Sequence, residues 1–174
     1  TRKESSAASD VYKRQVWSRE KLLQSFIKEA PDLEQEIRLV FSDLSTIVRK
    51  FPKSDSWVQS LKDRGYHVYY LSNYSSHVRK DTEKELTFMK LMDGGIMSYE
   101  VQMIKPDLVI YQTLMERYDL QPEECVFLDD TKANIDGALR AGMQGILVKT
   151  QEQAMQDPVS YTHLRAHETS QDLV

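Results

Sequence analysis

The stretch that decides the fold of this chain is Val126-Phe127-Leu128-Asp129-Asp130-Thr131-Lys132-Ala133-Asn134. An apolar run ends there in two adjacent acids, and a helix-like segment follows at once. Side chains at the carboxyl end of a strand in an α/β sheet face the crevice in which ligands bind. Two carboxylates held together repel each other unless a cation lies between them. The stretch therefore predicts a magnesium site formed by Asp129 and Asp130.

Strand-like and helix-like segments alternate around this stretch. The predicted strands are 66–71, 94–98, 125–128 and 145–148. The predicted helices between them are 76–89, one opened by Lys105-Pro106-Asp107, and 134–141. Alternation of this kind implies parallel strands joined by right-handed crossovers. We therefore expect a doubly wound α/β domain with a parallel sheet.

A small helical segment precedes that domain. Ser18 caps a first helix that Pro31 ends, and the apolar residues from Ile37 to Phe51 recur at three- and four-residue steps, which predicts a second helix. A third helix starts at Ser54 or Asp55, and Gly65 closes it.

Three further polar residues stand at the ends of predicted strands or the starts of predicted helices. Ser72 and Asn73 follow one strand and offer a hydroxyl and backbone N–H groups to an anion. Lys105 precedes a helix, and Pro106 biases its backbone away from helical geometry, so its amine can reach inward. Hydroxyl, lysine and acid pair are the groups that phosphoryl transfer needs. Each alone has a plainer interpretation, as a turn, a solvated loop or a helix cap.

Composition narrows the function classes. The net charge of −4 argues against non-specific binding to nucleic acid, which needs a basic surface. No apolar stretch is long enough to span a bilayer, so we expect no membrane partner. Cys125 is the only cysteine, which excludes an intrachain disulfide, favours a buried structural thiol over a catalytic one and makes a cytoplasmic location the expectation.

The stretch from Gly65 to Thr150 resembles the core of the haloacid dehalogenase-like hydrolases, and more narrowly their small-cap phosphatases, such as the glucose-1-phosphate phosphatase-like and β-phosphoglucomutase-like members. Three of the family's motifs occur in order: 69–73 matches the second, 104–107 the third and 127–135 the fourth. The resemblance implies a Rossmann-like core over 53–157 and a partial helical cap over 16–52.

The same resemblance assigns roles to the site residues. Ser72 and Asn73 would bind phosphate, with Ser72 holding the transferring group, and Lys105 would bind phosphate and neutralise its charge and that of the nucleophile. Asp130 would bind Mg²⁺ directly. Asp129 would bind it through water or orient the site, and Asn134 would support the acids.

The family's first motif, a strand that ends in Asp-x-Asp, has no counterpart in the 174 residues. Its first aspartate is the nucleophile and its second the general acid and base. The only similar stretch leads to Asp43, but Ser45 stands where the second aspartate is required and the surrounding periodicity is helical. We therefore expect a core without its central first strand and a gap between the strands that carry Ser72 and Asp129. The chain as written should be poorly stable and inactive.

The two ends do not share the pattern of the middle. Residues 1–15 and 158–174 have no apolar periodicity, and segments of both resemble translated sequencing-adapter sequence. We expect both to be non-native or disordered tails, with the natural protein spanning about 16–157 and cut at both ends. The alternative is a pair of genuine flexible tails.

The function that this resemblance implies is a Mg²⁺-dependent phosphatase acting on a small phosphorylated metabolite through an aspartyl-phosphate, present here without its nucleophile. The alternative is a nucleophile-less domain that binds a phosphorylated ligand or a protein. Dehalogenase chemistry is disfavoured because it needs no magnesium, and a mutase would use the same motifs. The substrate and the oligomeric state stay open.

Overall fold

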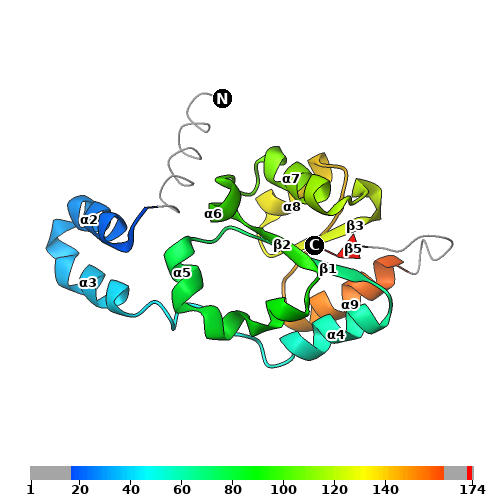
Figure 1. The fold of residues 1–174 in the computed structure, drawn as a ribbon, viewed down its shortest axis with the longest axis horizontal. Helices are drawn as coiled ribbons and strands as arrows, with labels where there is room; N and C mark the ends of the chain where they lie inside the picture. Colours follow the sequence, from blue (N-terminus) through cyan, green and yellow to red (C-terminus); the bar gives the residue numbers. More distant parts are fainter. Residues whose placement is uncertain (1–16, 163–171, 174) are drawn as a thin grey trace.

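A parallel β-sheet forms the centre of the computed structural model, which describes residues 17–162 and 172–173. The sheet order is β2-β1-β5-β3-β4, and neighbouring strands pair in parallel. The strands are β1 (His67–Ser72), β2 (Gly94–Met97), β3 (Cys125–Asp129), β4 (Gln144–Leu147) and β5 (Asp172–Leu173). The expected α/β class and parallel sheet are confirmed, and Figure 1 shows helices on both faces of the sheet.

The helices follow the strands in alternation, as expected. In chain order the helical elements are α2 (Arg19–Glu29), η1 (Pro31–Leu33), α3 (Glu34–Ser42), α4 (Ser54–Asp63), α5 (Ser76–Asp81), η2 (Glu83–Leu91), α6 (Ser98–Val101), α7 (Leu108–Tyr118), η3 (Pro122–Glu124), α8 (Lys132–Arg140) and α9 (Gln151–Thr162). None of the helices in this described part of the chain is long and apolar enough to cross a membrane.

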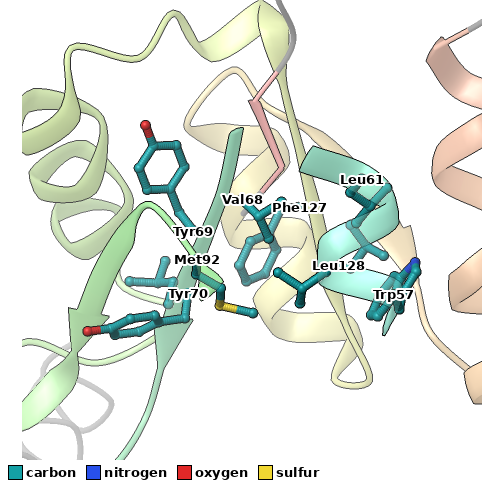
Figure 2. Close-up of a pocket in the computed structure, with 10 residues that line it drawn as sticks. Trp57, Leu61, Val68, Tyr69, Tyr70, Met92, Phe127 and Leu128 are labelled. Carbon is teal, nitrogen blue, oxygen red and sulfur yellow. The ribbon is translucent and has the colours of Figure 1, made fainter. Parts of the chain in front are cut away.

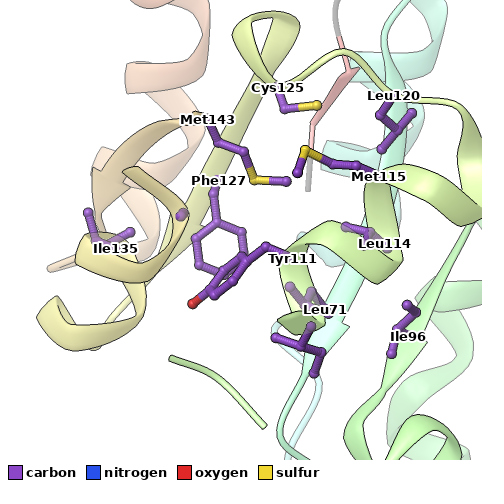
Figure 3. Close-up of a cluster of buried hydrophobic side chains, with 12 residues drawn as sticks. Leu71, Ile96, Tyr111, Leu114, Met115, Leu120, Cys125, Phe127, Ile135 and Met143 are labelled. Atoms are coloured by element: carbon purple, nitrogen blue, oxygen red, sulfur yellow. The ribbon is translucent and has the colours of Figure 1, made fainter. Parts of the chain in front are cut away.

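The larger hydrophobic cluster lies between the sheet and helices α7 and α8 (Figure 3). Its centre is an edge-to-face contact between Tyr111 of α7 and Phe127 of β3, whose ring centroids are 5.4 Å apart. Both side chains are almost completely buried, and Cys125 at the start of β3 is buried beside them. The interpretation of Cys125 as a buried residue is therefore confirmed. This packing fixes β3 against α7, so the acid pair at the carboxyl end of β3 has a rigid base.

A second cluster covers the opposite face of the sheet. Val58 and Leu61 of α4 pack there with one residue from each of β1, β3 and β4, namely Val68, Val126 and Ile146. Phe127 faces the first cluster and its neighbour Val126 faces the second, because successive side chains of a strand point to opposite faces. The sheet is thus buried on both sides, as the apolar runs at its strands indicate.

Several expected limits differ from those in the structure. The second helix, expected to reach Phe51, ends at Ser42, and the apolar residues after it lie in turns and extended chain. The helix expected over 76–89 breaks at Thr82 into α5 and the 3-10 helix η2. The strand expected to include Ser98 ends at Met97, because Ser98 begins α6. Helix α9 runs to Thr162 and so passes Pro158, where a disordered tail was expected to begin.

The expected gap in the sheet is partly filled. Strand β5 lies between β1 and β3, where it pairs with His67 and Val68 on one side and with Cys125 and Val126 on the other. It reaches only the amino-terminal ends of both strands. Of the tail expected over 158–174, the structure describes 158–162 in α9 and 172–173 in β5, and the tail expected over 1–15 lies outside the described residues.

Helices α2 and α3 form a small pair set apart from the sheet (Figure 1). Ser18 caps α2 as predicted, since its hydroxyl accepts a hydrogen bond from the Lys21 N–H at 3.2 Å. Phe26 and Phe41 join the two helices at a centroid distance of 5.6 Å. Leu23 is the buried residue of α2, no residue of α3 is buried, and Leu39 of α3 is 74% exposed.

Candidate active site

A buried ion pair is the centre of the candidate site. Lys105 Nζ lies 2.6 Å from Asp129 Oδ2, and the two side chains are only 9% and 8% exposed. Lys105 comes from the loop before α7 and Asp129 from the carboxyl end of β3, so the fold brings together residues 24 positions apart. The ammonium also lies 5.3 Å from the centre of the Phe127 ring. The cation that pairs with the Asp129 carboxylate is therefore the Lys105 ammonium.

Asp129 is held by more than this lysine. Its Oδ1 accepts hydrogen bonds from the Thr131 N–H at 2.8 Å and from the Asn134 carboxamide at 2.9 Å. Burial by itself would raise the pKa of the Asp129 carboxyl, but Lys105, Asn134 and Thr131 together hold this pKa below its usual value. Asp129 is thus a fixed, charged group, and Asn134 is placed to support it.

Asn73 acts on the backbone of Lys105. Its carboxamide oxygen accepts a hydrogen bond from the Lys105 N–H at 2.8 Å, and its NH₂ group donates to the Lys105 carbonyl at 3.0 Å. These two bonds tie the loop after β1 to the loop before α7. The side chain of Asn73 therefore positions Lys105, and only its backbone remains to meet an anion.

Ser72 is the last residue of β1 and lies beside Met97 of β2 in the sheet register. The loop that follows it is held by Ser98, a residue that the sequence analysis did not select. The Ser98 hydroxyl accepts a hydrogen bond from the Tyr74 N–H at 2.8 Å and donates one to the Tyr74 carbonyl at 3.1 Å. Ser98 is completely buried. No pattern in the sequence marks it, because its partner is 24 residues away.

Asp130 differs from its neighbour in being exposed. One of its oxygens accepts a hydrogen bond from the Thr131 hydroxyl at 3.3 Å. Within the part of the chain that the structure describes, no group of three or more His, Cys, Asp or Glu side chains could hold a metal ion. Mg²⁺ commonly takes one or two carboxylates and completes its shell with water and phosphate oxygens. The donors at Asp130 and Asp129 fit such a partly hydrated ion, and they do not fit a site built from protein ligands alone.

An open pocket of roughly 570 Å³ lies against the acid pair. Besides Asp129 and Asp130, its polar lining includes Ser54 at the start of α4, and Lys149 and Thr150 after β4. The sequence analysis missed these three residues, although Lys149 and Thr150 follow a predicted strand as Ser72 and Asp129 do. The pocket is large enough for a small metabolite, and it carries one cationic side chain, Lys149, among its lining residues.

Asp43 lies far from this site. It follows α3, and Figure 1 shows α3 well away from β3. Its carboxylate accepts a hydrogen bond from the Ser45 N–H at 2.8 Å, and hydrogen bonding to Ser45 lowers its pKa. The helical periodicity of the residues before it is confirmed up to Ser42. Asp43 is a helix-terminal residue and does not end a strand.

Comparison with known proteins places the chain among hydrolases. A family model described as haloacid dehalogenase-like hydrolase matches residues 3–142. A sesquiterpene phosphatase of Aspergillus oryzae is 29% identical over 114 residues, which are 64% of this chain and 57% of the relative. A glyceraldehyde 3-phosphate phosphatase of Methanothermobacter thermautotrophicus is 31% identical over 107 residues, or 60% of this chain and 47% of the relative. Matches also include (S)-2-haloacid dehalogenases.

Solved structures show the same fold. A haloacid dehalogenase-family enzyme of Bacteroides thetaiotaomicron, in complex with magnesium and inorganic phosphate, superposes with a TM-score of 0.62 at 20% identity and covers 86% of this chain and 74% of that one. The chain spans about half the length of the curated relatives that it matches. Since the family model matches well over half of the sequence and the fold agrees, the chain belongs to the haloacid dehalogenase-like hydrolases.

Proposed function

We propose that this chain carries the phosphate-binding and metal-binding part of a Mg²⁺-dependent phosphatase that acts on a small phosphorylated metabolite in the cytoplasm. The observation that carries the proposal is the buried pair of Lys105 and Asp129 with the exposed Asp130 beside it. The ion pair holds the Lys105 ammonium at the edge of the crevice. The exposed carboxylate of Asp130 would then bind the metal ion. Phosphatases among the curated relatives support the same chemistry.

Each residue then has a defined task. The ammonium of Lys105 would attract the phosphate and neutralise part of its charge. Backbone N–H groups after Ser72 and its hydroxyl would bind the other phosphate oxygens. Mg²⁺, held by Asp130 and oriented by Asp129, would supply Lewis-acid polarisation of a phosphate oxygen. Lys149, in the adjoining pocket, is placed to meet an anionic or polar group elsewhere on the substrate.

We further propose that the chain as written binds phosphate without hydrolysing it. No Asp-x-Asp occurs in its sequence, and Asp43 follows α3, which lies apart from the sheet in Figure 1. This absence also favours a second candidate function, a nucleophile-less domain that binds a phosphorylated ligand or a protein. An in-frame Asp-x-Asp in the genomic sequence before Val16 would favour the enzyme, and a true start codon there would favour the binding module.

Calorimetric titration with inorganic phosphate, with and without MgCl₂, tests the proposed site. We expect weak binding that requires Mg²⁺ and is lost in Asp130→Asn. A matched control is Asp136→Asn, which removes an exposed acid of α8 that pairs with Lys132 and leaves the site intact. Binding that is equal without Mg²⁺, or unchanged in Asp130→Asn, would contradict the metal assignment. Mg²⁺-dependent turnover of p-nitrophenyl phosphate by the purified chain would contradict the proposed inactivity.

A further inference from the structure

We propose that the substrate of this site is a phosphate monoester of an apolar alcohol or phenol, and that the open pocket beside the acid pair binds its organic group. This pocket, here called the ester pocket, is the one of roughly 570 Å³ that Asp129 and Asp130 line. The proposal rests on the proposed phosphatase function, because it names the class of substrate for the same site.

Apolar side chains from several separate segments line the ester pocket. They are Phe51 before α4, Trp57 of α4, Leu128 of β3, Val148 after β4 and Ala154 of α9. Figure 2 shows Trp57 and Leu128 lying next to each other. Leu128 directly precedes the two acids, so the apolar wall begins where the proposed metal site ends. The organic group of an ester whose phosphate binds at Asp130 would therefore lie along this wall.

Phe51 is an exposed aromatic residue that the surrounding chain holds in place. It is 61% exposed, and its carbonyl accepts a hydrogen bond from the Ser54 N–H at 3.0 Å. The preceding residue, Lys50, donates its N–H to Glu85 at 2.7 Å and pairs its ammonium with Asp55 at 2.8 Å. A large apolar side chain exposed in a pocket marks a place where a ligand can cover it. Because the backbone at this position is already fixed, a ligand would not have to order it on binding.

Several polar groups of the lining already have partners within the protein. The Asp129 carboxylate accepts from the three donors described above. The Thr150 hydroxyl accepts a hydrogen bond from the Gln153 N–H at 3.1 Å in the first turn of α9. Asp130 is the proposed metal ligand. A sugar carries a hydroxyl on nearly every carbon, and each hydroxyl that is buried without a partner costs free energy. The ester pocket therefore favours an apolar group over a polyol.

The size and the lining of the ester pocket indicate the kind of apolar group. Pockets of about 300–1,000 Å³ take small organic ligands, so this one has room for a group of one or two rings. Phe51 and Trp57 offer two aromatic side chains, and aromatic rings bind one another in offset or edge-to-face contacts. An aryl group therefore fits the lining better than a polar group of the same size. The exposed ammonium of Lys149 is then the partner for a polar substituent on such a group.

Calorimetric titration in MgCl₂ with three probes tests the proposal. The probes are inorganic phosphate, glucose 1-phosphate and 1-naphthyl phosphate, of which the two esters carry organic groups of similar size and opposite polarity. We expect 1-naphthyl phosphate to bind at least about tenfold tighter than inorganic phosphate, because binding buries its rings against the apolar wall. Glucose 1-phosphate should bind within about threefold of inorganic phosphate.

Two variants locate the organic group. Phe51→Ala removes one ring from the ester pocket and should lower the preference for 1-naphthyl phosphate over inorganic phosphate about fivefold. Leu39→Ala is the matched control, because it also trims an exposed apolar side chain but lies on α3, outside the pocket lining. The control should keep the full preference.

Three results would overturn the proposed substrate class and leave the phosphate site standing. They are binding of 1-naphthyl phosphate no tighter than that of inorganic phosphate, equally tight binding of glucose 1-phosphate, and an undiminished preference in Phe51→Ala. Binding of 1-naphthyl phosphate that does not require Mg²⁺ would also overturn it, since the ester would then not be held at the acid pair. If none of the probes binds, the proposed function itself fails, and the substrate class fails with it.

Discussion

Replacing Lys105 by methionine should destabilise the fold, and the size of the effect should depend on pH. The substitution keeps most of the side-chain volume but removes the ammonium that lies 2.6 Å from Asp129. Asp129 would then be an almost buried carboxylate that keeps only the hydrogen bonds from Thr131 and Asn134. Removal of one partner from a buried pair costs roughly 3–5 kcal/mol. Because the two remaining bonds still stabilise the charge, we expect a loss of about 3 kcal/mol at pH 7.

The pH dependence follows from the pKa of Asp129. In the unaltered chain the pKa of folded Asp129 is lower than the unfolded-state pKa of about 3.9. The charged carboxylate therefore stabilises the fold at pH values above about 3.9. This stabilisation is lost only as the pH falls through the pKa of the folded state. In Lys105→Met, burial is no longer offset by a cation, and the pKa should rise. Asp129 would then take up a proton in mildly acidic solution and lose its unfavourable charge. The stability difference between the two proteins should therefore be smaller at pH 4.5 than at pH 7.

Urea unfolding at both pH values, followed by far-ultraviolet circular dichroism, measures these differences. Lys132→Met is the matched control, because Lys132 forms a pair of similar length, 2.7 Å, with Asp136, but the two side chains are 74% and 44% exposed. An exposed pair contributes about 0–1 kcal/mol. Adding Asp129→Asn to Lys105→Met should restore part of the stability, since it removes the unpaired charge. A loss at pH 7 no larger than that of Lys132→Met, or one that does not change with pH, would refute the reasoning.

Three further substitutions test single contacts, each measured by urea unfolding at pH 7. Asn73→Ala removes both hydrogen bonds to the Lys105 backbone and should cost roughly 1–3 kcal/mol and weaken phosphate binding. Tyr118→Phe removes a hydroxyl that accepts from the Gly95 N–H at 2.7 Å and donates to its carbonyl at 3.1 Å, so a loss of about 1–2 kcal/mol is expected. Gly137→Ala should cost about 1–3 kcal/mol, because the new Cβ would lie 2.9 Å from the Pro106 carbonyl oxygen in the loop that carries Lys105.

Each of these variants has a control substitution. Ser72→Ala trims the last residue of β1, next to Asn73. Tyr66→Phe removes a tyrosine hydroxyl elsewhere, and Leu139→Ala alters an exposed position of α8. We expect each control to change the free energy of unfolding by less than about 0.5 kcal/mol. A test variant that behaves like its control would show that the contact in question does not hold the site.

The sequence could indicate the site because its residues stand at the ends of strands. Ser72 and Asp129 both end buried apolar runs, and in a parallel sheet such ends meet at one edge. The helix limits were harder to infer, because periodicity continues past the point where a helix stops. The apolar positions from Leu44 to Phe51 keep a helical spacing, yet the chain there leaves the helix after Ser42.

The local pattern by itself determined the α/β class, the order of strands along the chain and the position of Lys105 before a helix. These features depend on the periodicity of neighbouring side chains and on turn chemistry, which are written in short stretches of sequence. Only the tertiary structure decided that Lys105 pairs with Asp129, that Asn73 binds the Lys105 backbone across 32 residues, and that β5 pairs with the amino-terminal ends of β1 and β3. These contacts join residues far apart in the chain. They depend on how the apolar faces of the sheet close over one another, which no short stretch of sequence specifies.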